Sequence, residues 1–223
     1  MTEVKGGRRQ MYAARTRADI LAAATDLFAT RGFDGTAISD IGKAARASKG
    51  TVYHHFADKQ EIFAEVFTTV QSAVMRTALD AMAAEGDPWA RLHRATRAFL
   101  RGYVSDSTAR SILRQALGVL GWDRVRELDE ATALPVIRAT LERFLADGEI
   151  RQVRVDAAAQ LVFDLYCNAV LVITAAEDPD RAAGDVETIV LSLLGGLRPE
   201  GRADPGPWTE PDEPESGAVG AGR

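Results

Sequence analysis

Apolar residues recur every three or four positions along most of this chain, the spacing that places side chains on one face of an α-helix. The first such stripe predicts a helix over about 16–30, and Gly32 is expected to end it. Two shorter helices are predicted over 36–45 and from Ser48 to Phe56. Because no stretch alternates apolar and polar residues as a half-buried strand would, the chain is predicted to be all-α.

The same period continues after residue 58. Asp58 is placed to cap a helix that runs from Lys59 to about Ala84, and Asp87 with Pro88 supplies the cap and first-turn proline of the next helix. Further helices are predicted over about 108–120, 122–131, 134–147, 156–176 and 185–197, with a break or first turn at Pro135. The stretch 198–223 holds five of the eight prolines and much acid and glycine, so a disordered tail is expected there.

Composition limits the class of protein. Hydrophobic residues make up 46% of the 223 positions, which is enough for a buried core. Cys167 is the single cysteine, which excludes a disulfide framework and a multi-cysteine zinc site and favours the cytoplasm. The most apolar stretch, 161–176, is short for a bilayer and contains Asp164 and Asn168, so we expect a soluble cytoplasmic protein without metal or cofactor.

Charge is distributed unevenly along the chain. Residues 1–60 contain ten Lys and Arg against six Asp and Glu, whereas residues 61–223 contain seventeen against twenty-six. A basic module joined to an acidic body suits a polyanionic partner at one end only. Such local imbalance is also common in proteins that bind no polyanion, so the motifs must decide.

The predicted helices after Thr36 have the pattern of a helix-turn-helix. Its miniature core would be Ile38, Ile41, Ala45, Val52 and Phe56. Helical spacing then places Lys49, Gly50, Tyr53 and His54 on the outer face, with Thr51 beside them. A cation, hydroxyls, a small residue and an imidazole are the groups that contact phosphates and base edges in a DNA groove.

The segment from Thr36 to Lys59 resembles the signature of the TetR family of repressors (TetR/AcrR type), and the resemblance extends from about Arg15 to Phe67. It rests on residues at the family's spacing, which are Gly32, Phe33, Thr36, Ile41, Ser48, Gly50, Tyr53, His55, Phe56 and Lys59. The resemblance implies phosphate contacts by Thr36, Ser48, Tyr53, His55 and Lys59. It implies base reading by Lys49, Gly50, Thr51 and His54.

Two positions depart from the family pattern. Gly42 stands where Ala is usual, and Arg46 stands where the turn usually has Gly. Arg46 must therefore adopt a positive φ or reshape the turn, and a slightly less stable motif is expected. Arg8, Arg9, Arg15 and Arg17 are either a solvated arm or an arm that becomes ordered on DNA.

The resemblance also implies dimerisation through the last two helices and a small-molecule cavity in the body. The broad apolar face after Asp185 provides the dimerisation candidates Val186, Ile189, Val190, Leu193, Leu194 and Leu197. Aromatic and polar residues spread over the body provide the ligand-binding candidates Phe99, Tyr103, Trp122, Phe144, Phe163, Tyr166 and Asn168. For each of these residues, packing in an ordinary core is the alternative.

These observations divide the chain into four parts. They are a flexible basic arm (1–15), a helix-turn-helix domain (16–60, motif about 36–56), a helical domain for effector binding and dimerisation (61–197) and the tail (198–223). The expected function is that of a ligand-released repressor, a homodimer on palindromic double-stranded operator DNA with an apolar effector. The alternatives are a helical ligand-binding protein or enzyme without DNA function, and a constitutive DNA binder. An enzyme is disfavoured because the chain has three His and no phosphate-binding loop.

Overall fold

The computed structural model describes residues 3–83 and 86–199, with side chains from residue 10, and every regular element in that part of the chain is a helix. The elements are α1 (Glu3–Arg31), α2 (Ile38–Ala44), α3 (Lys49–His55), α4 (Lys59–Ala83), α5 (Pro88–Ser105), α6 (Ser107–Leu120), α7 (Trp122–Ala146), α8 (Val155–Ala175) and α9 (Pro179–Gly195). The prediction of an all-α chain is confirmed.

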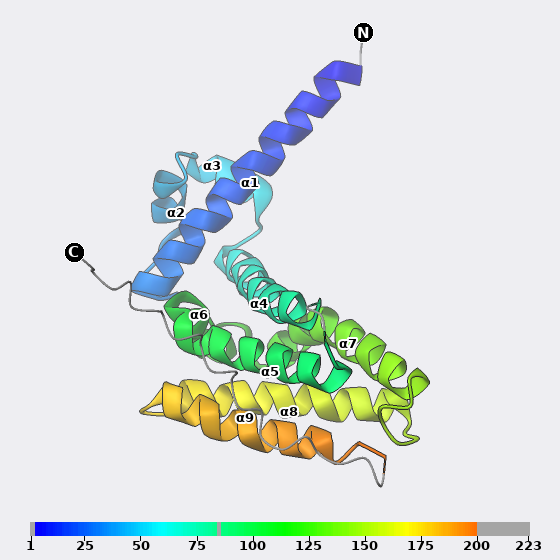
Figure 1. The fold of residues 1–223 in the computed structure, drawn as a ribbon. Helices are drawn as coiled ribbons and strands as arrows, with labels where there is room; N and C mark the ends of the chain where they lie inside the picture. The colour runs from blue at the N-terminus through cyan, green and yellow to red at the C-terminus, as the bar shows by residue number, and fades with distance from the viewer. Residues whose placement is uncertain (1–2, 84–85, 200–223) are drawn as a thin grey trace, which may run out of the picture.

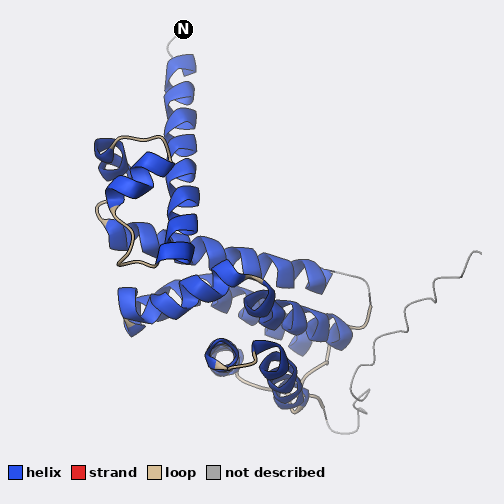
Figure 2. Cartoon of the chain, turned by 90° about the vertical axis from the view of Figure 1, so that its left-hand side faces the viewer, coloured by secondary structure: helices blue, strands red, loops and turns tan. Residues whose placement is uncertain are grey.

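The helices form an N-terminal unit and a larger helical body. Figure 1 shows α2 and α3 packed beside α1 at one end of the molecule, and α8 and α9 lying side by side at the other. Helix α4 leads from the N-terminal unit into the body, where it packs against α5, α6 and α7. Figure 2 shows the same separation from a second direction. The long α4 therefore belongs to both parts.

Side-chain caps begin several of these helices, as the sequence indicates. The Ser48 hydroxyl accepts a hydrogen bond from Thr51 N at 3.0 Å, and the Asp58 carboxylate accepts one from Glu61 N at 2.8 Å. Asp87 accepts from Ala90 N at 3.0 Å ahead of Pro88, which is in the first turn of α5. Each cap satisfies a backbone N–H that has no partner within its own helix.

Two helix starts differ from the prediction. Helix α1 begins at Glu3, so the segment 3–15, expected to be a flexible arm, is helical. Helix α9 begins at Pro179 rather than at 185, with the Asp178 side chain accepting from Arg181 N. An apolar stripe marks only the buried part of a helix, and residues 10–15 are helical but exposed. The stripe in α1 therefore predicts where burial begins and not where the helix begins.

Helix α7 is continuous where two helices, 122–131 and 134–147, were predicted. Pro135 lies inside it and is exposed, as is Ala131 one turn earlier. Proline removes one backbone hydrogen bond, and here the carbonyl that loses its partner is on the solvent side, where water can replace the bond. The tail predicted for 198–223 lies outside the described residues from residue 200 onward.

Aromatic packing joins the N-terminal unit to α4. The ring of Phe28 lies 5.7 Å from that of Phe33 and 5.3 Å from that of Phe63, and the Phe33 and Phe63 rings meet edge to face at 5.5 Å. Such pairs add about 0.5–1.5 kcal/mol each beyond the area they bury. They fix the start of α4 against α1.

Among the described residues, α8 is long and apolar enough to cross a membrane by length and composition. Its buried residues, including Ala169, Val170 and Ile173, belong to the core of the helical body. A core helix of a helical bundle meets the same criterion, so this helix alone is weak evidence for a membrane span.

Candidate DNA-binding surface and ligand cavity

Helices α2 and α3 close over the small core that the sequence predicts. Ile41, Val52 and Phe56 are buried, and Ile38 and Ala45 pack against them. The seven residues of each helix are too few for an isolated helix to be stable, so this shared core and the packing against α1 hold the unit together.

The turn between α2 and α3 explains both departures from the family pattern. Arg46 has φ +54°, so it adopts the left-handed conformation that glycine usually supplies. Ala47 N donates to the carbonyl of Gly42 at 2.8 Å, and a Cβ built on Gly42 would lie 2.9 Å from the Ala47 carbonyl oxygen. The chain of this turn therefore passes so close to position 42 that an alanine there would force a shift.

Replacing Arg46 by Gly is expected to raise the free energy of unfolding by about 0.5–1 kcal/mol, because a left-handed non-glycine residue costs about 1–2 kcal/mol and glycine's extra entropy in the unfolded chain offsets part of the gain. Urea denaturation measures the difference. Arg46→Ala is the control, because it removes the charge but keeps the unfavourable φ. A glycine variant no more stable than the alanine variant would contradict this account of the turn.

The outer face of α3 carries the residues expected to read DNA. Lys49, Gly50, Tyr53 and His54 are exposed, and Thr51 is half-buried beside them. The Lys49 ammonium lies 5.8 Å from the centre of the Tyr53 ring, one turn along the helix. The Thr51 hydroxyl shares a hydrogen bond of 2.8 Å with the exposed hydroxyl of Ser48. This face therefore presents a cation, an imidazole and three hydroxyls to solvent.

Thr36 and Lys59 are turned toward the protein instead. Thr36 is 1% exposed, and its hydroxyl donates to the Gly32 carbonyl at 2.8 Å. The Lys59 ammonium donates to the carbonyls of Phe33 at 2.8 Å and Thr36 at 3.0 Å and lies 4.1 Å from the Phe33 ring centre. In this conformation both side chains hold the loop between α1 and α2 and are engaged before any DNA binds.

His55 and Arg17 are engaged as well. His55 is half-buried, and its pKa is lowered by burial and by the nearby His54 and Arg17. It is therefore neutral at pH 7, so it can donate a hydrogen bond but contributes no positive charge. The Arg17 guanidinium pairs with Glu65 of α4 and lies 4.8 Å from the Phe56 ring centre. Arg17, which the sequence grouped with a basic arm, is therefore part of the folded N-terminal unit.

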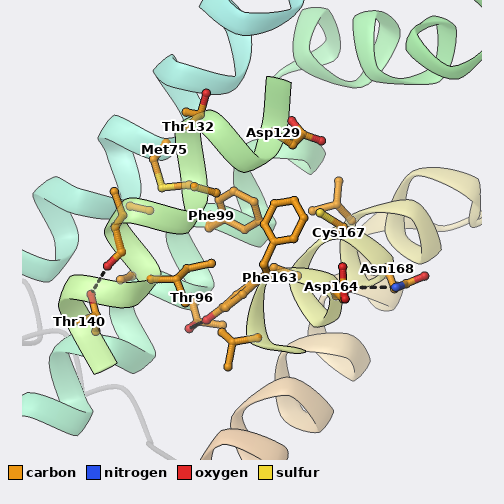
Figure 3. Close-up of a pocket in the computed structure, with 18 of the residues that line it drawn as sticks. Met75, Thr96, Phe99, Asp129, Thr132, Thr140, Phe163, Asp164, Cys167 and Asn168 are labelled. Atoms are coloured by element: carbon orange, nitrogen blue, oxygen red, sulfur yellow. Dashed lines mark hydrogen bonds between the residues drawn. The ribbon is translucent and has the colours of Figure 1, made fainter. Parts of the chain in front are cut away.

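A cavity of about 450 Å³ opens in the helical body between α4, α5, α6, α7 and α8 (Figure 3). All seven residues predicted from the sequence as ligand contacts line this cavity: Phe99, Tyr103, Trp122, Phe144, Phe163, Tyr166 and Asn168. Trp122 and Asn168 are exposed, whereas Tyr103, Phe144 and Phe163 are buried. The walls are thus mainly apolar and aromatic, as in most small-molecule sites.

Several polar lining residues were not predicted from the sequence. The Thr96 hydroxyl and the Tyr166 hydroxyl lie 2.6 Å apart and hydrogen-bond to each other. Gln71 of α4 donates to the Asp129 carboxylate of α7 at 2.9 Å and accepts from the hydroxyl of Tyr103 on α5. Gln71 and Asp129 carry no local signal, because each sits in an ordinary amphipathic helix and only the fold turns it inward.

Burial alters the chemistry of two groups in this cavity. It raises the pKa of Asp129 to about 6, against the smaller opposing effect of the Gln71 hydrogen bond. It raises the pKa of the Cys167 thiol to about 12, so the single cysteine is protonated at pH 7 and is not a nucleophile.

The dimerisation candidates divide into two groups. Val190 and Leu194 are buried in the core of the chain, and Val186 and Leu197 are partly buried against it. Ile189 and Leu193 are 58% and 57% exposed, one turn apart on α9. Leu161 and Val172 of α8 are also large apolar residues left exposed. The chain therefore leaves apolar side chains uncovered on both of its last two helices.

Two family models match the sequence. The model described as "Bacterial regulatory proteins, tetR family" matches residues 20–66, and the one described as "Tetracyclin repressor-like, C-terminal domain" matches residues 89–197. The first match contains most of α1, all of α2 and α3 and the start of α4. The second contains the body from α5 to α9, including most of the cavity walls.

Individual proteins agree with these matches. TcmR of Streptomyces glaucescens, an HTH-type transcriptional regulator, is 27% identical over 216 residues, or 92% of this chain and 91% of TcmR. YhgD, an uncharacterized HTH-type transcriptional regulator of Bacillus subtilis, is 28% identical over 149 residues, or 66% of this chain and 78% of YhgD.

A solved structure of a TetR-family transcriptional regulator from Pectobacterium atrosepticum has the same fold, with a TM-score of 0.73 at 24% identity, covering 84% of this chain and 96% of that one. The matching families and relatives are regulators of transcription and not enzymes. This chain therefore belongs to the TetR family of bacterial transcriptional regulators, and α2 and α3 are its DNA-binding helix-turn-helix.

Proposed function

We propose that this regulator is a repressor that binds a palindromic operator as a homodimer and is released by a small, mainly apolar effector in the cavity. The observation that carries the proposal is the apolar cavity of about 450 Å³ in a body whose helices α4 and α6 also hold the DNA-binding unit. A constitutive DNA binder would need neither the cavity nor the shared helices. A cytoplasmic location is part of the proposal.

The uncovered apolar residues of α8 and α9 support the homodimer. Leu161, Val172, Ile189 and Leu193 would be buried if two copies packed these helices into a four-helix interface. On α9 the small residues Gly184, Thr188 and Ser192 lie one turn apart and are exposed on the neighbouring strip, which would allow the partner helix to approach closely. A two-fold dimer then presents two copies of α3 to two operator half-sites.

Contact with DNA is assigned to the residues at the start and on the outer face of α3, most of which are exposed. We propose that Lys49, Gly50, Thr51 and His54 face base edges, and that Ser48 and Tyr53 contact phosphates with neutral His55 as a further donor. Thr36 and Lys59 act indirectly, because their hydrogen bonds set the loop that positions α2.

A displacement caused by effector binding can be transmitted to α3 through α6. Leu113 and Leu117 of α6 line the cavity, while Gln115 of the same helix donates to the Phe28 carbonyl at 3.0 Å and accepts from Phe33 N at 2.7 Å. Ser111 donates to the Ala29 carbonyl at 2.9 Å. These bonds satisfy carbonyls in the last turn of α1, so a displacement of α6 by a ligand would move α1 and the helices packed on it.

The proposal predicts specific binding to palindromic sites enriched from random double-stranded DNA, with an affinity that falls steeply as salt rises. In gel-shift assays Tyr53→Phe should weaken binding to all sequences about equally, because it removes a phosphate contact. Thr51→Val and His54→Gln should instead change the preferred bases, with each lost base contact costing about 1–3 kcal/mol.

A matched control is Thr30→Val, because Thr30 is exposed in the last turn of α1 and is not among the residues assigned to DNA contact. If no sequence is enriched at low salt, the operator-binding proposal is wrong. If Thr51 and His54 variants select the same bases as the unmodified protein, the assignment of base contacts is wrong. The dimer and the cavity are tested by separate experiments.

A further inference from the structure

The cavity holds one acidic group, Asp129, that has no positive partner in the part of the chain that the structure describes. Three charged side chains line it, which are Arg126, Asp129 and Asp164. Arg126 is already shared between two carboxylates, with its Nε 2.8 Å from Glu130 and its Nη1 3.0 Å from Asp164. Within residues 3–83 and 86–199, the hydrogen bond of Asp129 is to the neutral amide of Gln71, and no cationic side chain pairs with it.

Two neutral groups, Tyr103 and Cys167, lie near the Asp129 carboxylate, and burial raises the pKa of both, so both stay uncharged near pH 7. The charged groups in the same region are Arg126, one turn earlier on α7, and the carboxylates of Glu130 and Asp164 that it pairs with. The Tyr103 hydroxyl donates to Gln71, which in turn donates to Asp129, so the amide is oriented to stabilise the ionised carboxylate. Above pH 6 the cavity therefore contains a carboxylate that accepts a hydrogen bond from Gln71 but is paired with no cationic side chain of the described residues.

Aromatic rings provide the other half of the site. The Phe99 ring centre lies 5.6 Å from that of Tyr103 and 5.5 Å from that of Tyr166, with both pairs near edge to face. Figure 3 shows the rings of Phe99 and Phe163 in the middle of the lining residues, with Asp129 toward one side and Thr96 toward the other. Ring faces attract organic cations, and the attraction increases where water is excluded.

We propose that the cavity selects an organic monocation, a quaternary or protonated amine on an apolar body, with its charge at Asp129 and its body among Phe99, Phe163 and Tyr166. This inference rests on the proposed function of the cavity as the effector site. An anion would be repelled by the Asp129 carboxylate, and the positive charge of Arg126 is already neutralised by Glu130 and Asp164. A bare metal ion is disfavoured because the described residues include no group of three or more metal-binding side chains.

The test is calorimetric titration of the purified protein without DNA, using three probes of similar size. They are benzyltriethylammonium, neutral N,N-diethylbenzamide and anionic 4-tert-butylbenzoate. At about pH 7.5 the cation is expected to bind at least about tenfold more tightly than the neutral probe, the size of effect that one charge-assisted contact supplies, and the anion most weakly. Lowering the pH to about 5 should weaken cation binding about tenfold, because Asp129 with a pKa of about 6 takes up a proton.

Asp129→Asn keeps the shape and the Gln71 contact but removes the charge, so it should abolish both the preference for the cation and the pH dependence. Asp123→Asn is the matched control, because Asp123 is exposed on the same helix. Thermal melting establishes that both variants are folded. Equal cation binding by Asp129→Asn and the unmodified protein, or no preference for the cation, would overturn the inference. Operator binding by the same preparation tests the proposed function separately.

Discussion

Replacing Leu193 by Glu is expected to give a folded monomer that binds operator DNA at least about a hundredfold more weakly. Leu193 is 57% exposed in the single chain, so the new carboxylate is solvated as long as the chain is alone. In the proposed dimer it would be buried without a partner in both copies, at a cost of about 3 kcal/mol or more, which corresponds to about a hundredfold in the dimer dissociation constant. Sedimentation and gel-shift assays measure the two effects.

Leu193→Gln and Val190→Glu are the comparisons that make this result specific. The glutamine variant removes a similar apolar area without a charge, so its dimer should be weakened less. Val190 is 1% exposed, and a carboxylate there would be buried within the chain itself. That variant should fail to fold, because the cost approaches the whole stability of a typical domain, about 5–15 kcal/mol. A Leu193→Glu protein that is still a dimer would refute the interface through α9.

Replacing Gln115 by Leu is expected to loosen the junction between α1 and α6 without unfolding the body. The substitution removes the acceptor of Phe33 N and the donor to the Phe28 carbonyl, both part-buried. The Phe28 carbonyl keeps its hydrogen bond from Gly32 N at 3.1 Å, but Phe33 N is left unsatisfied, which costs about 1–3 kcal/mol. Amide hydrogen exchange at the end of α1 and in the loop after it should therefore accelerate by about tenfold or more, since 1.4 kcal/mol corresponds to a factor of ten.

Gln60→Leu is the matched control for this junction. The Gln60 side chain also joins two helices, donating from α4 to the Val119 carbonyl at 2.8 Å, but it is exposed and water can replace the lost bond. Its exchange profile should remain close to that of the unmodified protein. If the two variants exchange at the same rate after Phe28, Gln115 does not hold the junction, and the transmission route through α6 would need another contact.

Much of this protein could be predicted from the sequence because the signals are local. Ser48, Asp58 and Asp87 cap the helices that they precede, since a capping bond spans only three residues. The positive φ of Arg46 follows from its place in a turn that normally requires glycine. Likewise, the aromatic residues between α5 and α8 line the cavity because helical spacing turns them to the inner face of each helix.

The tertiary structure decided which residue faces which neighbour. Periodicity predicts one broad apolar face on α9, but only packing against α5 and α8 divides it into the buried Val190 and the exposed Leu193. Lys59 has the spacing of a DNA contact, yet its ammonium is held by carbonyls more than twenty residues away.

Gln71 and Asp129 are 58 residues apart and meet across the cavity, and Gln115 reaches carbonyl and amide groups more than 80 residues before it. A sequence determines the direction of a side chain relative to its own helix axis, whereas burial, hydrogen-bond partners and pKa depend on the helices that surround it, and those are fixed only when the chain folds.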